Sequence, residues 1–199
     1  MKKLGCTTIG LIALAVILVL WGVGKYNSLV ELKQNVQKAW SNVEAQYQRR
    51  ADLIPNLVNT VKGYAAHESE TFQAVVEARN KATQTQINIE NGEELSAEAI
   101  EKFQAAQNSL TGALGKLIAI AENYPELKAD GLFQDLQSQL EGTENRVNVA
   151  RQEFNEVSKE FNQTVLKFPT NLLAKIFGFN EFAYFKSAEG TEQAPVVEF

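Results

Sequence analysis

A polar cluster in the first third of the chain has the residue types that recognise a charged group. Arg49, Arg50, Asp52 and Asn56 fall within eight residues. A guanidinium can hold a carboxylate or a phosphate through two parallel hydrogen bonds, so the cluster is a candidate interaction surface. The structural interpretation, which we favour, is that Asp52 caps a helix at a hairpin and pairs with a neighbouring arginine.

The single histidine, His67, is the second place where chemistry could occur. His67-Glu68 begins like a zinc-protease motif, but Thr71 stands where the second histidine is needed. Tyr64 stands where a di-iron bundle would need a glutamate. Nucleophile-elbow, phosphate-loop and dinucleotide motifs are absent from the sequence. We therefore predict no catalytic residue, no metal site and no cofactor; the alternative is an enzyme or enzyme regulator that uses carboxylates and His67 in a pocket between helices.

The C-terminus supports a separate hypothesis. The chain ends in Val196-Val197-Glu198-Phe199, and a short extended end with a free carboxylate can be captured by domains that add a β-strand. Val197 and Phe199 would carry that contact. The other interpretation is a frayed tail, which is the usual state of chain ends.

These groups must be positioned by a chain that begins with an apolar segment. Leu4 to Gly24 is 21 residues without a charge, and about 20 are needed to cross the hydrocarbon core of a bilayer. A cleaved signal peptide would need small residues near its end, and Trp21 is a poor fit, so we predict an uncleaved anchor. Lys2 and Lys3 lie close together before the span, which favours an N-terminus inside and a domain outside the cytoplasm.

Composition limits the partners. Beyond the anchor, 17 basic residues face 24 acidic ones, because Lys2 and Lys3 are removed from a total of 19. A net charge of −7 argues against binding of nucleic acid, which needs a basic surface. Cys6 is the only cysteine, so one chain can form neither a disulfide nor a multi-thiolate metal site.

Apolar residues at steps of three and four predict helices throughout the rest of the chain. We expect a first helix from Tyr26 to about Arg50 and a second from Asp52 with Pro55 in its first turn. After a polar loop at residues 89–92, Ser96 starts a third helix that ends near Tyr124. In the second helix, the stem of Arg79 would pack on the apolar face while its guanidinium reaches water. The fourth helix has a four-heptad seam, typical of a coiled coil, at Phe133, Leu136, Leu140, Thr143, Val147, Ala150, Phe154, Val157 and Phe161.

The predicted fold class is therefore all-α. A single transmembrane helix continues into an antiparallel four-helix bundle, and a short helix after Phe168-Pro169 and a tail follow it. The expected domains are an anchor at 1–24, a bundle at 25–178 and a C-terminal tail at 179–199.

Several motifs, in order along the chain, resemble the signature of the LemA family. The resemblance covers nearly all of the chain after Gly24. The motifs that carry it are Tyr26-Asn27-Ser28-Leu29-Val30, Gln48-Arg49-Arg50-Ala51-Asp52-Leu53-Ile54-Pro55-Asn56-Leu57-Val58, Val61-Lys62-Gly63-Tyr64-Ala65-Ala66-His67-Glu68, Ala78-Arg79, Glu122-Asn123-Tyr124-Pro125-Glu126-Leu127-Lys128-Ala129, Thr143-Glu144-Asn145-Arg146 and Phe177-Gly178-Phe179. It implies a membrane-anchored helical bundle and no established enzymatic reaction. One relative is associated with building magnetosome membranes, which implies a role in membrane organisation.

From these observations we expect a non-enzymatic scaffold in the bacterial inner membrane, crossing the bilayer once. The expected partners are the lipid bilayer, a protein that the sequence does not identify and further copies of the chain. Self-association is a hypothesis, because a heptad seam can also be satisfied inside one chain.

Overall fold

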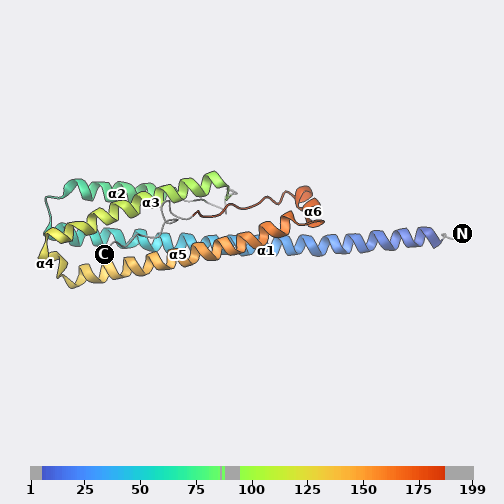
Figure 1. Cartoon of the computed structure of the whole chain (residues 1–199), viewed down its shortest axis with the longest axis horizontal. Helices are drawn as coiled ribbons and strands as arrows, with labels where there is room; N and C mark the ends of the chain where they lie inside the picture. The colour runs from blue at the N-terminus through green and yellow to red at the C-terminus, as the bar shows by residue number, and fades with distance from the viewer. Residues whose placement is uncertain (1–5, 86, 88–94, 187–199) are drawn as a thin grey trace, which may run out of the picture.

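The computed structural model describes residues 6–85, 87 and 95–186, and every regular element among them is helical. The elements are α1 (Cys6–Tyr64), α2 (Ser69–Gln84), α3 (Ala97–Ile120), η2 (Ala121–Asn123), α4 (Pro125–Lys128), α5 (Gly131–Leu166) and α6 (Thr170–Phe177). The long helices lie side by side, and α1 extends far beyond the others toward the N-terminus (Figure 1). The all-α prediction is confirmed for the described part of the chain.

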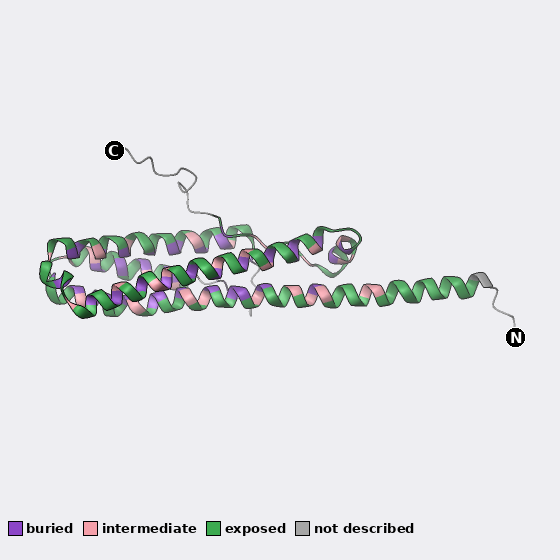
Figure 2. Ribbon diagram, turned by 60° about the horizontal axis from the view of Figure 1, so that its bottom comes forward, coloured by how far each residue is buried: buried purple, intermediate pink, exposed green. Residues whose placement is uncertain are grey.

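Helix α1 joins the apolar segment and the packed part of the chain without a break over 59 residues. Its large apolar side chains from Ile9 to Leu20 are all exposed, whereas Leu29, Val36 and Trp40 are fully buried (Figure 2). Helix α1 therefore has two parts. The side chains of its apolar N-terminal part are covered by nothing in the described chain, and its amphipathic C-terminal part packs against the other helices.

The predicted hairpin at residues 50–52 is wrong. Helix α1 continues through Pro55 to Tyr64, and the turn to α2 lies at residues 65–68. Asp52 therefore caps no helix. The apolar spacing does not stop at Arg50, because Ile54, Leu57 and Val61 carry the same buried stripe forward.

Helix α5 runs antiparallel to α1 in a constant register. The Trp40 ring packs on Phe154, Arg50 pairs with Glu144 and the Tyr64 hydroxyl donates to Asp130, and in each pair the two residue numbers add up to 194. All nine predicted seam positions of α5 are buried or half-buried. The register therefore holds over the 25 residues of α1 from Tyr64 back to Trp40.

Asp130 begins α5 and connects it to the end of α1. Its carboxylate accepts from the Phe133 N–H at 2.8 Å and from the Tyr64 hydroxyl at 2.8 Å. These hydrogen bonds, the Phe133 one first, lower the pKa of Asp130 below its ordinary value. Asp130 is thus an N-cap and a link between α1 and α5.

Helices α2 and α3 pack against each other and cover the half of α1 and α5 that is remote from the apolar span (Figure 1). Ser96 caps α3, as predicted, by accepting from the Ala99 N–H at 3.2 Å. The predicted polar connection at residues 89–92 lies outside the described residues.

The segment 179–186 leaves α6 and returns along α3 and α5 in an extended conformation. Asn162 bonds both backbone groups of Phe182, at 2.7 and 2.9 Å, and Asn155 does the same for Phe185, at 3.0 and 2.9 Å. The two asparagines lie one heptad apart, so they hold the segment as a neighbouring strand would. The Phe185 ring then stacks on Trp40 at 5.8 Å and completes the aromatic core.

Candidate functional site

The predicted polar cluster divides between two faces of α1. Arg49, Asp52 and Asn56 are exposed and follow one side of the helix, at i, i+3 and i+7. Asp52 accepts a hydrogen bond from Gln48 at 2.7 Å within the helix. We call Arg49, Asp52 and Asn56 the α1 strip. It presents one cation, one carboxylate and one amide to the surroundings.

Arg50 points the opposite way, into the core, where it is 3% exposed. Its Nη1 donates to Glu144 Oε2 at 2.9 Å and to Thr111 Oγ1 at 3.0 Å. Its Nη2 donates to the Gln107 side-chain oxygen at 2.7 Å and to the Gln107 backbone carbonyl at 3.3 Å. The guanidinium also lies over the Tyr47 ring, 5.0 Å from its centre.

This network uses the fork of the guanidinium to join three helices. Arg50 comes from α1, Gln107 and Thr111 from α3, and Glu144 from α5. A buried cation is costly unless it is paired and hydrogen-bonded, and here four of its donor contacts are made. The chemistry is structural, since a guanidinium stays protonated and cannot act as a base at neutral pH. The sequence alone predicts Arg50 at the surface because its partners are 57 to 94 residues away along the chain.

Pro55 has a partner that the sequence did not reveal. A proline inside a helix has no N–H for the carbonyl four residues before it, which here belongs to Ala51. The Arg79 Nε, on α2, donates to the Ala51 oxygen at 2.9 Å. The half-buried Arg79 guanidinium therefore does not simply reach water, as predicted, but satisfies the acceptor that Pro55 leaves free.

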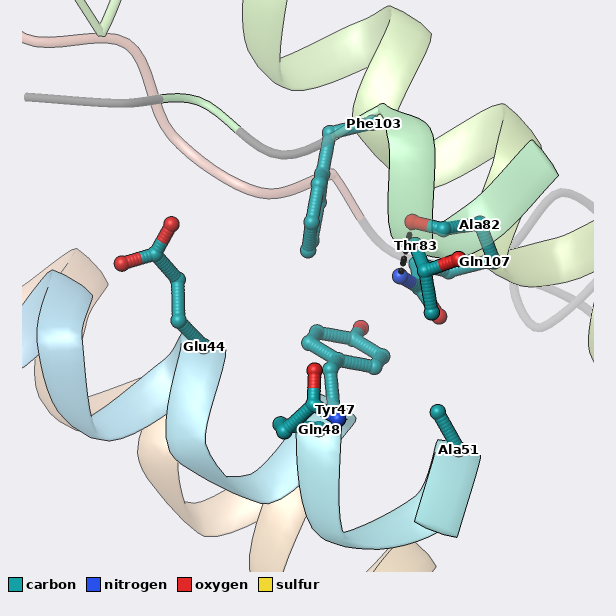
Figure 3. A pocket seen from close by; sticks show the side chains of 8 residues that line it. All are labelled: Glu44, Tyr47, Gln48, Ala51, Ala82, Thr83, Phe103 and Gln107. Atoms are coloured by element: carbon teal, nitrogen blue, oxygen red, sulfur yellow. Dashed lines mark hydrogen bonds between the residues drawn. The ribbon is translucent and has the colours of Figure 1, made fainter. Parts of the chain in front are cut away.

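A small pocket opens beside this network, between α1, α2 and α3 (Figure 3). The Tyr47 and Phe103 rings point into it, and the Gln107 amide closes one side by donating to the Ala82 carbonyl at 3.4 Å. Its free space of about 10 Å³ is at the lower limit for one water molecule. Burial raises the pKa of the Tyr47 phenol, although Arg151 and Arg50 oppose the shift, so Tyr47 stays protonated at neutral pH. The pocket is too small for an organic substrate.

His67 lies in the turn between α1 and α2 and is exposed. It is not among the residues that line the pocket. Within residues 6–85, 87 and 95–186, no three His, Cys, Asp or Glu side chains gather as metal ligands would. Val197 and Phe199 lie outside the described residues, so capture of the C-terminus stays a prediction.

Comparison with known proteins finds relatives that align with most of the chain. The chain is 29% identical over 175 residues to the magnetosome protein MamQ of Magnetospirillum gryphiswaldense, covering 81% of this chain and 64% of that protein. It is 27% identical over 178 residues to MamQ 2 of Paramagnetospirillum magneticum, covering 81% and 65%. The match to Protein LemA of Metamycoplasma hominis has 25% identity over 167 residues, covering 84% and 71%. The chain thus spans less than two thirds of the length of these MamQ proteins.

The motifs quoted above, from Gln48 to Phe179, fall inside one continuous match. The family model for "LemA family" covers residues 39–199, which include the last 26 of the 59 residues of α1 and all later helices. The chain belongs to the LemA family.

Proposed function

We propose that this protein is a non-enzymatic scaffold anchored in the membrane by residues 1–24, with an antiparallel four-helix bundle at 25–178 that binds a protein partner or further copies of itself. The observation that carries the proposal is the unbroken helix α1. It contains the one helix in the described chain that is long and apolar enough to cross a membrane, and it continues directly into the packed core. A single helix transmits position and orientation from the bilayer to the bundle.

The exposure of the apolar segment supports an anchor. Nothing in the described chain buries the most hydrophobic 18-residue window, whereas a core helix of similar composition would be mostly buried. The names of the MamQ relatives connect those proteins to the magnetosome, an association that supports a membrane-related role for this chain. We place the membrane as the bacterial inner membrane and the bundle outside the cytoplasm, because of the lysine pair before the span.

The α1 strip is the proposed contact surface for a protein partner. Its side chains are exposed on a helix whose other faces pack, and Arg49 can bind a carboxylate in a bidentate way. In the described part of the chain, the geometry gives no support to the enzymatic alternative, since His67 is exposed in a turn and the pocket beside Tyr47 holds about one water.

The full chain in detergent provides the test of self-association. Light scattering over a wide concentration range should show a mass above that of a monomer, and Arg49→Glu should lower the association. Lys159→Glu is the matched control, because Lys159 is an exposed cation on a different helix, α5. A monomer at every concentration would remove self-assembly. If Lys159→Glu weakened association as much as Arg49→Glu, general charge and not the α1 strip would be responsible.

A reporter fused to the C-terminus provides the test of orientation. Alkaline phosphatase is active only outside the cytoplasm, so an active fusion supports the proposed side. A fluorescent fusion that matures only in the cytoplasm would overturn it and direct the partner search to cytoplasmic complexes.

A further inference from the structure

The corner between α5 and α6 exposes an unusual amount of apolar surface. Outside the apolar span, exposed large apolar side chains are scattered along the described chain except at this corner. Here five occur within twelve residues: Leu166 (58% exposed), Phe168 (80%), Leu172 (54%), Ile176 (73%) and Phe177 (54%). We call these five residues the apolar corner. A contiguous exposed apolar patch on a protein surface indicates a contact site.

The register between α1 and α5 gives the level of this corner along α1. The pairs described above add up to 194, so Leu166, the last residue of α5, lies opposite residue 28. Tyr26 follows Lys25, the first charged residue after the span that starts at Leu4. The apolar corner therefore lies where the proposed membrane span ends.

Ring contacts confirm this level independently of the register. The Tyr26 ring is 4.8 Å from the Phe177 ring and 5.8 Å from the Phe179 ring. These contacts join the end of α6 to α1 at the edge of the span. Tyr26 is itself of a residue type that collects at membrane interfaces, where an apolar ring and a polar hydroxyl suit the boundary.

The direction of α6 suits a helix that lies in the plane of a membrane surface. Figure 2 looks nearly along α6, at the end of α5, while α1 lies in the plane of the picture, so the two helices cross steeply. Ala174 is buried against the core, whereas Leu172 and Ile176, one turn apart, are exposed. A helix with an exposed apolar face can bury that face in the boundary between headgroups and acyl chains.

Charge at the corner also fits a lipid surface. Lys25, Lys167 and Lys175 are exposed within the same region, at the end of the span and on either side of the α5–α6 turn. Long lysine side chains can lie along apolar surface and place the ammonium group among phosphates.

We propose that the apolar corner is a second membrane contact, inserted into the headgroup and acyl boundary of the same bilayer that α1 crosses, on the side where the bundle emerges. The inference rests on the proposed anchor. Its occupant is the lipid bilayer, because Phe177 of the patch contacts Tyr26 of α1 just beyond the end of the span. Two attachments, one transmembrane and one interfacial, hold the bundle at a fixed angle to the membrane.

Depth-dependent quenching in vesicles tests this proposal with the full chain. Cys6→Ala removes the only cysteine, and single cysteines at Ile176, Leu14 or Val149 then carry an environment-sensitive nitrobenzoxadiazole label. Vesicles of phosphatidylcholine and phosphatidylglycerol contain lipids with a spin label either near the headgroup or deep in the acyl chain. Val149 is the matched control, since it is 63% exposed on α5 but lies opposite residue 45, far from the span.

The expected result is that the Ile176 label emits at shorter wavelength and is quenched more by the shallow than by the deep spin label. The Leu14 label should show the opposite preference, and the Val149 label should be unquenched. An unquenched Ile176 label beside a quenched Leu14 label overturns the apolar corner as a lipid contact and leaves the anchor intact. An unquenched Leu14 label overturns the anchor and this inference with it. A shift at Ile176 that grows with the ratio of protein to lipid, without quenching, means that a second copy covers the corner and also overturns the proposal.

Discussion

The hydrogen bond from Arg79 to the Ala51 carbonyl leads to a prediction that a double-mutant cycle can test. In the native chain, Arg79→Ala leaves a carbonyl without a partner, because Pro55 has no N–H to offer. A hydrogen bond from a charged group contributes about 1.5–3 kcal/mol, and we expect this loss in the free energy of unfolding. In the Pro55→Ala background, the new N–H of residue 55 bonds the same carbonyl. There, Arg79→Ala should cost less than about 1 kcal/mol.

Fluorescence of Trp40 during unfolding in urea provides the measurement. Trp40 is fully buried among aromatic rings, so its emission reports on the packed core. Trp21 is the other tryptophan, and Trp21→Phe gives a full-length chain with a single reporter in detergent micelles. The midpoint and slope of each transition give the four free energies of the cycle.

Lys81→Ala is the control for the charge of α2, since Lys81 is an exposed cation two residues from Arg79. It should change the free energy of unfolding by less than about 0.5 kcal/mol in both backgrounds. Equal costs of Arg79→Ala with and without Pro55 would refute the reasoning, because the two residues would then act independently.

Three further predictions concern the buried cation, the docked segment and pH. Arg50→Met should lower the free energy of unfolding by about 1–3 kcal/mol, because the buried Gln107 side chain loses its charged hydrogen-bond donor. Arg49→Met at the exposed neighbour should change it by less than about 0.5 kcal/mol, and urea unfolding measures both. Asn162→Ala should speed hydrogen exchange of the backbone amide that it holds and cost about 1–3 kcal/mol. The pKa of Asp130 is lowered, first by the Phe133 amide at the start of α5 and then by the Tyr64 hydroxyl. The ionised carboxylate therefore stabilises the folded chain above the ordinary pKa of 3.8, and this stabilisation is lost as pH falls through the lower pKa of the folded state. The difference in urea midpoint between native chain and Tyr64→Phe should therefore shrink from pH 7 to pH 3.

Local patterns in the sequence predicted much of the fold. The stripe of α5, the cap at Ser96 and the short helix after Pro169 depend on residues within a few turns of one another. Such interactions leave a periodic signal in the sequence, since the residues on the packed side of a helix recur every three or four positions.

The position of the first turn could not be read in the same way. Arg49-Arg50 followed by Asp52 and Pro55 has the composition of a hairpin, and the prediction gave that composition more weight than the continuing stripe at Ile54 and Leu57. The physical reason lies 28 residues away, where Arg79 supplies the donor that makes a proline acceptable inside α1. Interactions across that distance leave no period in the sequence.

The sequence predicts the aromatic segment 179–186 as part of a tail for a related reason. Phe179, Phe182 and Phe185 recur at steps of three, which is a signal of burial, but their position in the core depends on Asn155 and Asn162 of α5. An asparagine on a helix usually indicates a solvated position. Here each asparagine side chain bonds the backbone N–H and C=O of one residue of the segment. Only the three-dimensional structure shows that α5 and this segment are in contact.

Under the proposed anchoring, the unbroken helix α1 sets the height of the α1 strip above the membrane. Arg49 lies 23 residues beyond Tyr26 in one continuous helix, which is a rise of about 35 Å at 1.5 Å per residue. A flexible stem would let that strip sample many heights, but α1 has no break before Tyr64 and is braced by α5 along this length. The proposed contact of the apolar corner with the bilayer would fix the angle of α1 to the membrane as well. A partner that binds the α1 strip must therefore extend well above the membrane, which favours proteins with their own folded domains over short membrane peptides.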